Sequence, residues 1–132
     1  MKKLNTGEIY RAFKLKDNDT VIRKLNLRNY CRDNNVSHTI SNHYWLIDFE
    51  DLLKHLNPKN YTECKNLPRI RTKIGAIHEW NKHHRTKIKH YIIDCICDSG
   101  KVFVYKNGRH NIINYDELEQ EIIKRLKEKG KY

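Results

Sequence analysis

The sequence predicts an α+β fold made of two tandem copies of one unit, in which two helices, a β-hairpin and a third helix follow one another. Three observations predict it. The second half of the chain repeats the pattern of the first, apolar residues recur at helical spacing, and strand-forming runs flank turn residues. We expect one unit over residues 1–57, a linker containing Pro58 and Pro68 over residues 58–69, and the other unit over residues 70–132.

An internal repeat underlies this division. Residues 20–56 align with residues 86–122 without a gap, and the similar pairs fall at apolar, acidic and turn positions. The identical pairs are Thr20 and Thr86, Ile22 and Ile88, Cys31 and Cys97, Val36 and Val102, Ile47 and Ile113, and Leu52 and Leu118. The alternative is chance similarity between two segments with the same order of elements.

Helical spacing and capping residues place the first two helices of each unit. The first is predicted over residues 6–15 and 72–83, and Asn5 followed by Glu8 resembles a capping box. The second is predicted over residues 20–33 and 86–98, each beginning at a threonine, because a threonine hydroxyl accepts a hydrogen bond from an otherwise unpaired amide. The second helices are expected to end at Asn34-Asn35 and Ser99-Gly100, since Asn and Gly tolerate positive φ.

A hairpin is expected next in each unit. In the second unit, Asn107-Gly108 lies between the strand-forming runs 102–105 and 110–113, which is a strong hairpin signal. The first unit has the weaker turn residues Asn42 and His43 at that place.

The third helix is predicted to start at Asp48 in the first unit and at Asn114 in the second. Asp51 and Glu117 follow three residues later, so each start resembles a capping box. The helix of the second unit is expected to run to about residue 129 and to stop at Gly130.

The charge of the chain favours a polyanionic partner. Lys and Arg number 27 against 16 Asp and Glu, which gives a net charge of +11 spread over both units. No apolar run approaches the roughly twenty residues of a membrane span, and the N-terminus has no apolar stretch typical of a secretion signal. We therefore expect a cytoplasmic, nucleoid-associated bacterial protein with reduced cysteines and no membrane contact.

The order of elements and several short motifs together resemble the excisionase and MerR-type winged helix-turn-helix family. The motifs are residues 21–24, 31–36 and 44–53 in the first unit, and residues 87–90, 97–102 and 107–118 in the second. They correspond to a basic recognition helix, an apolar residue entering the wing, a wing tip, and an N-cap with an acidic pair before the last helix. The first unit departs from the family pattern, because Asn42 and His43 replace Gly and Arg at the wing tip.

The resemblance implies double-stranded DNA as the partner, with the second helix in the major groove and the wing at a neighbouring minor groove or the backbone. It implies a non-catalytic accessory protein of a phage or mobile element, an excisionase or recombination directionality factor, with an integrase as a further partner. It is expected to act as a monomer or weak oligomer on DNA. A transcriptional regulator with the same two heads is the main alternative. An interaction protein whose first head has lost DNA binding, and an RNA-binding protein, also remain open.

The residues predicted to contact DNA lie near the start of a second helix or at a hairpin tip. They are Thr20, Arg23, Lys24, Arg28, Asn42 and His43 in the first unit, and Arg85, Thr86, Lys87, Lys89, His90, Lys106, Asn107, Arg109 and His110 in the second. Arg109 is the best wing candidate, because a narrow minor groove attracts arginine. The alternative for each of them is an ordinary solvated surface.

No cofactor, metal or catalytic site is expected. Cys31 and Cys97 occupy equivalent helix ends and are interpreted as core thiols. Cys95 and Cys97 are two apart on a helix and therefore point in different directions, and no Cys-x-x-Cys pair exists, which disfavours zinc. The sequence contains no nucleophile elbow, phosphate-binding glycine loop or carboxylate dyad, so we do not expect an enzyme.

Overall fold

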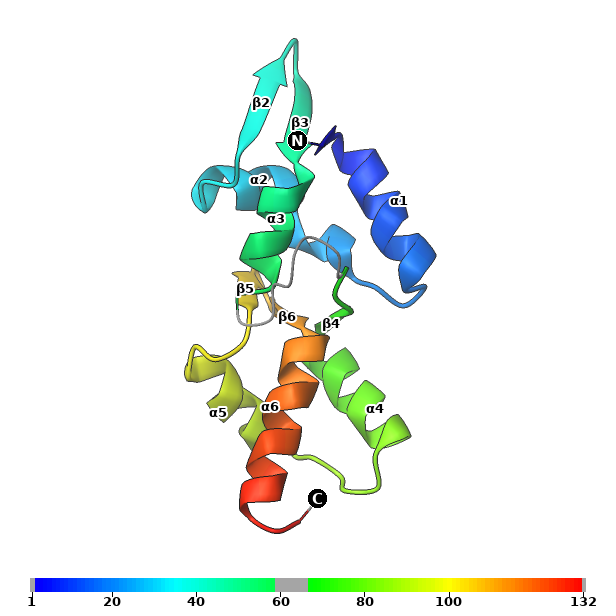
Figure 1. Ribbon diagram of the computed structural model, residues 1–132, viewed down its shortest axis with the longest axis vertical. Coiled ribbons are helices and arrows are strands. Elements are labelled where there is room, and N and C mark those ends of the chain that lie inside the picture. The colour runs from blue at the N-terminus through cyan, green and yellow to red at the C-terminus, as the bar shows by residue number, and fades with distance from the viewer. Residues whose placement is uncertain (1, 59–66, 132) are drawn as a thin grey trace.

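Two small three-stranded antiparallel sheets and six α-helices make up the computed structural model, which describes residues 2–58 and 67–131. The first unit comprises β1 (Lys3–Leu4), α1 (Thr6–Lys16), the 3₁₀ helix η1 (Ile22–Leu25), α2 (Leu27–Asp33), β2 (His38–Ser41), β3 (Tyr44–Asp48) and α3 (Phe49–Leu56). The second comprises β4 (Ile70–Thr72), α4 (Lys73–His83), α5 (His90–Asp98), β5 (Val104–Asn107), β6 (His110–Asn114) and α6 (Tyr115–Glu128). The α+β class is confirmed, and the two units follow one another along the long axis (Figure 1). Residues 59–66 of the predicted linker lie outside the described residues.

The two sheets repeat one topology. Their strand orders are β1-β3-β2 and β4-β6-β5, and the hairpin pairs His38 with Ile47 in one and Val104 with Ile113 in the other. The sequence analysis missed β1 and β4, because strands of two or three residues are too short to show an alternating pattern.

Most of the predicted helix starts are confirmed. Asn5 and Glu8 form both bonds of a capping box, at 2.8 and 3.0 Å, and Thr72 caps α4 by accepting from the Gly75 amide. Asp48 and Asn114 cap α3 and α6. These bonds form within four residues of chain, so local sequence is enough to predict them.

The predicted capping boxes at α3 and α6 are wrong in their second half. The N-cap amides of Asp48 and Asn114 donate to the carbonyls of Ser37 and Phe103. The acidic residues of the motif are used elsewhere: Asp51 accepts from the Ser37 amide at 2.7 Å, and Glu117 accepts from the Phe103 amide at 2.8 Å. In both units this carboxylate therefore fastens the entrance of the hairpin to the third helix.

Replacing Glu117 by alanine is expected to lower the free energy of unfolding by about 1–3 kcal/mol, because the buried Phe103 amide loses its acceptor. Asp51→Ala is the matched variant in the first unit and is expected to cost less, because water can reach the Ser37 amide. Urea denaturation followed by circular dichroism measures both. Equal losses for the two variants would contradict this account.

The predicted second helices are wrong in their first turns. In the first unit, Asn26 has φ of 56° and ends η1, and its side chain accepts from the Asn29 amide to start α2. Asn enters the left-handed region more readily than most residues, which makes this break possible. In the second unit, Thr86 does not cap a helix. Its carbonyl instead accepts from the Trp80 indole at 2.6 Å, and α5 begins at His90.

The two units pack against each other through the second sheet. Phe103 and Ile112 belong to the same apolar cluster as the core of the first unit, and the Tyr30 ring contacts Phe103 and Tyr105 edge-on, with centroid distances of 5.8 and 5.0 Å. The Asn114 amide donates to the Leu56 carbonyl at the end of α3 at 2.7 Å. One face of the second sheet therefore closes the open end of the first unit.

This packing has no counterpart at the outer ends of the pair. On the first sheet, exposed Thr39 and Ser41 stand where the second sheet has Tyr105 and Asn107. At the other end, α6 has 14 residues against 8 in α3, and its extra turns pack Leu126 on the core of the second unit. The polar strand and the long helix therefore distinguish the two outer ends from the interface between the units.

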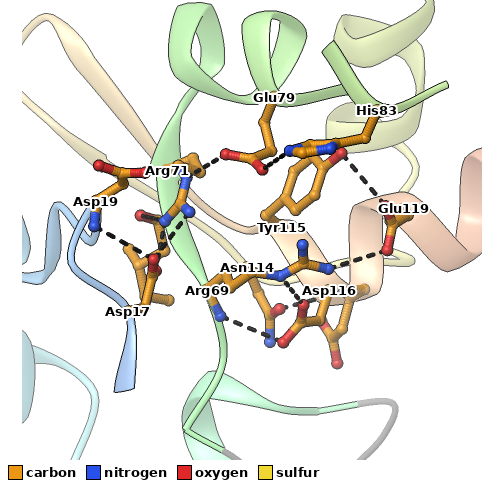
Figure 2. Close-up of polar contacts among 12 residues, drawn as sticks. Asp17, Asp19, Arg69, Arg71, Glu79, His83, Asn114, Tyr115, Asp116 and Glu119 are labelled. Carbon is orange, nitrogen blue, oxygen red and sulfur yellow. Dashed lines mark hydrogen bonds and ion pairs between the residues drawn. The ribbon is translucent and has the colours of Figure 1, made fainter. Parts of the chain in front are cut away.

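A largely buried ion pair also joins the units. Arg71 on β4, whose side chain is 5% exposed, bonds both carboxylate oxygens of Asp17 at the end of α1, at 2.5 and 3.0 Å. It also contacts Glu79 on α4 at 3.3 Å, and Figure 2 shows it between the two carboxylates. Burial alone would lower the pKa of Arg71, but these carboxylates raise it above its ordinary value, so the guanidinium stays charged.

A second cluster of ion pairs lies within the second unit. Arg69 bonds Asp116 at 2.6 Å and Glu119 at 2.9 Å (Figure 2), and Glu119 also contacts the His84 ring at 2.8 Å. Burial alone would raise the pKa of Glu119, but the hydrogen bonds from His84 and Arg69 hold it below its ordinary value. These charged side chains therefore bind one another within the fold.

Among the described residues, no helix combines the length and apolar character needed to span a membrane.

Candidate nucleic-acid interface

The residues nominated from the sequence lie in three places. Asn42 and His43 form the two-residue turn of the β2–β3 hairpin, which projects from one end of the molecule (Figure 1). Their φ values of 50° and 67° give the doubly left-handed turn that suits a two-residue hairpin. Both side chains are exposed.

The second place brings the two units together. The Asn107 amide at the end of β5 donates to the Lys24 carbonyl at the end of η1, at 2.6 Å. The β5–β6 hairpin of the second unit, with exposed Lys106 and Arg109, therefore lies beside the cationic turn of the first unit. The sequence assigned these residues to separate heads, whereas the fold places them on one surface. Because its amide is engaged, Asn107 positions the hairpin.

Arg23 and Lys24 lie on η1, before the second helix, and both are exposed. The Arg23 guanidinium stacks over the Tyr10 ring at 4.8 Å from its centroid, which holds the charge in place. The Thr20 hydroxyl accepts from the Ile22 amide at 3.4 Å. Arg28 is an exposed residue of α2, as expected.

The third place is the segment 85–90 that leads into α5. Two side chains of α4 hold its backbone: the Asn81 side chain accepts from the Ile88 amide at 3.0 Å, and the Trp80 indole donates to the Thr86 carbonyl. Trp80 is fully buried, and the His84 ring stacks on it at 3.6 Å. Four residues of the segment are exposed on the outside: Arg85, Lys87, Lys89 and His90. The segment thus presents cations from a fixed backbone, although residues 85–89 are not helical.

The nominated cations share one electrostatic property. They are Arg23, Lys24, Arg28, Arg85, Lys87, Lys89, Lys106 and Arg109. All of them are exposed, and over residues 2–58 and 67–131 none has a carboxylate within ion-pair distance. Arg69 and Arg71, which were not nominated, are instead consumed by ion pairs. The nominated charges therefore remain available to an external anion.

Sequence reasoning missed two cations beside Arg23. Arg11 and Lys14 on α1 line a cavity of about 180 Å³, together with Tyr10, Thr20, Ile22 and Arg23. Their three-residue spacing on the exposed face of α1 was a usable signal. The contribution of a first helix to the basic surface was not considered.

An apolar groove of about 170 Å³ borders the segment 85–90. It is lined mainly by Trp80, Ile88, Tyr91, Ile122 and Leu126. Ile22 and Leu56 are the first-unit residues that align with Ile88 and Ile122, and they belong to the apolar cluster that includes residues of the second sheet. In the second unit, by contrast, Tyr91 at the groove is 63% exposed. The groove lies where the corresponding part of the first unit is covered by the second sheet.

The three cysteines that the structure describes do not form part of a metal-binding group. Burial raises the pKa of Cys31 to about 12 and that of Cys97 to about 11, so both are neutral thiols near pH 7. Cys95 is exposed, and Cys64 lies outside the described residues. Within the part of the chain that the structure describes, no three His, Cys, Asp or Glu side chains are grouped suitably for a metal ion.

Comparison with protein-family models, curated proteins and solved structures found no match for this chain. Its function is therefore inferred from its own residues and geometry.

Proposed function

We propose that this protein is a non-catalytic, sequence-specific double-stranded DNA-binding protein built from two tandem winged helix-turn-helix units. The observation that carries the proposal is the set of exposed cations, without a carboxylate partner among the described residues, that lie on η1 and α2, in the segment before α5, and on the β5–β6 hairpin. Cations of this kind bind phosphates and release counterions, which supplies most of the affinity of a protein for DNA. The repeated strand–helix–helix–hairpin–helix order supports the same reading.

We assign contacts with the phosphate backbone and contacts in the grooves to different residues. Cations on the fixed segments at η1 and before α5 are suited to backbone phosphates, which set the register of the protein on the duplex. Arg28 on α2 and His90 at the start of α5 are the nominated side chains on helices that a major groove of about 12 Å can admit. Arg109 at the second hairpin tip is the candidate for the minor groove.

The biological role that we favour is that of an excisionase-like accessory factor of a phage or mobile element, working with an integrase. Two heads in one chain predict half-sites arranged as a direct repeat, whereas a two-fold dimer would predict a palindrome. A transcriptional regulator is the alternative. A recombination assay with the neighbouring integrase separates the two, because a regulator leaves the yield of excision unchanged.

Selection of bound sequences from a random duplex pool tests the proposal. We expect a recovered motif with two half-sites. Arg23→Glu/Lys24→Glu and Lys87→Glu/Lys89→Glu are each expected to weaken binding to that motif and to reduce the salt slope by about two or more. Lys124→Glu/Lys127→Glu on α6 is the control with the same change of charge.

Each outcome has a definite meaning. No duplex binding at low ionic strength would overturn the proposal. Loss of affinity in the Lys87 and Lys89 variant alone, with no loss in the Arg23 and Lys24 variant, would identify the first unit as a protein-interaction head.

A further inference from the structure

A small cavity opens between α1 and the turn at residues 20–23 in the first unit. Its lining consists of Tyr10, Arg11, Lys14, Thr20, Ile22 and Arg23, and its volume is about 180 Å³. We infer that this cavity is a binding site for one phosphate oxyanion. This inference rests on the proposed function only for the source of the phosphate. If the protein binds duplex DNA, the phosphate belongs to the backbone of the duplex.

The charged residues that line the cavity are all of one sign. Three of its six lining residues are cationic and none is acidic. The carboxylate of Asp17, the residue that follows α1, accepts two hydrogen bonds from the Arg71 guanidinium of the second unit, at 2.5 and 3.0 Å. Its charge is therefore balanced by Arg71. In the described chain neither Arg11 nor Arg23 has an ion pair. An anion entering the cavity therefore meets uncompensated positive charge.

The donors are held in place before an anion binds. The Arg23 guanidinium rests on the Tyr10 ring, and the Lys14 ammonium donates one hydrogen to the Asn18 carbonyl at 2.6 Å, which leaves two donors. The Thr20 oxygen accepts from the Ile22 amide, so its own hydrogen is available to a phosphate oxygen. Ile22 is 1% exposed and packs in the core of the first unit, which anchors this wall. Charge-assisted bonds of this type are the strong ones that phosphate recognition uses.

The second unit does not repeat this arrangement. Asn81 stands at the place of Lys14, His78 at that of Arg11 and Ile77 at that of Tyr10. The Asn81 side chain accepts from the Ile88 amide, and its carbonyl accepts from the Lys87 ammonium at 2.6 Å. Asn81 therefore fixes the segment 85–90 in the second unit, whereas the aligned residue Lys14 supplies a cation in the first unit. The phosphate site belongs to the first unit alone.

The experiment uses the full chain and the double variant Arg11→Gln/Lys14→Gln, whose side chains are exposed and leave the core intact. Lys124→Gln/Lys127→Gln is the matched control. Duplex affinity is measured by fluorescence anisotropy as a function of salt, and inorganic phosphate is titrated separately while the amide resonances of residues 10–23 are followed by NMR.

For a site that holds a backbone phosphate, the double variant is expected to lose between about tenfold and a hundredfold in duplex affinity at about 0.1 M salt. The magnitude of its salt slope is expected to fall by about one, because the site holds one phosphate. Saturable shifts with inorganic phosphate that disappear in the variant, combined with unchanged duplex binding, establish the site with a free phosphate as its ligand.

The inference is overturned if the variant changes neither the duplex salt slope nor the response to phosphate. This failure is distinct from that of the proposed function, which fails only if the unmodified protein ignores duplexes. The phosphate titration tests the cavity even then.

Discussion

Raising the salt concentration from about 50 to about 200 mM is expected to weaken duplex binding by this protein by roughly four orders of magnitude. Each cation that neutralises a phosphate releases a counterion, and the slope of log affinity against log salt is about −0.9 per contact. The eight exposed, unpaired Lys and Arg residues nominated as contacts then give a slope near −7. Fluorescence anisotropy of a labelled duplex at several salt concentrations measures it.

A matched pair of variants separates cations that contact phosphates from cations that only add to the net charge. Lys87→Gln/Lys89→Gln is expected to lower the magnitude of the slope by about two, whereas Lys124→Gln/Lys127→Gln on α6 leaves it unchanged. A slope shallower than about −3 would mean that few of these cations reach phosphates, and the proposed interface would then be wrong.

Replacing Arg71 by alanine is expected to lower the free energy of unfolding by about 3–5 kcal/mol. The substitution leaves the Asp17 and Glu79 carboxylates, which are 12% and 17% exposed, without the cation that both share. Removing one partner of a buried ion pair is costly because the remaining charge stays desolvated. Asp17 and Arg71 belong to different units, so the docking of the two units should weaken as well.

Urea denaturation of four variants tests this account: Arg71→Ala, Asp17→Ala, the double variant of the two, and Arg125→Ala. Arg71→Ala/Asp17→Ala is expected to lose less than the sum of the two single variants, because both remove the same interaction. Arg125→Ala breaks a partly exposed pair with Glu121 within one helix and is expected to cost at most about 0.5 kcal/mol. Similar losses for Arg71→Ala and Arg125→Ala would show that the ion pair between the units contributes nothing special.

Local chemistry explains which expectations succeeded. The caps at Asn5, Thr72, Asp48 and Asn114 and the two hairpins are confirmed, because each depends on bonds between residues close in sequence. The turn of the second hairpin is Gly108-Arg109, one residue later than the Asn107-Gly108 signal, because Asn107 pairs with His110 as the last residue of β5. The repeat also holds in the pairing of the strands, with the same register in both hairpins.

Long-range contacts explain which expectations failed. Trp80 and Asn81 hold the segment 86–88 extended, although Thr86 by itself is a good N-cap. Asp51 and Glu117 likewise bond a backbone amide 14 residues away and not the N-cap. Neither choice is visible in the sequence, because it depends on which donor the fold brings near.

The sequence by itself determined the α+β class, the order of elements in the two units and the excess of positive charge, since these depend on periodicity, capping and composition. Only the tertiary structure decided which charges are consumed within the fold, as at Arg71, and which residues of different units meet, as at Lys24 and Asn107. The reason is physical: charge and periodicity are properties of the chain, whereas the partner of each side chain is set by how the second sheet packs on the first unit.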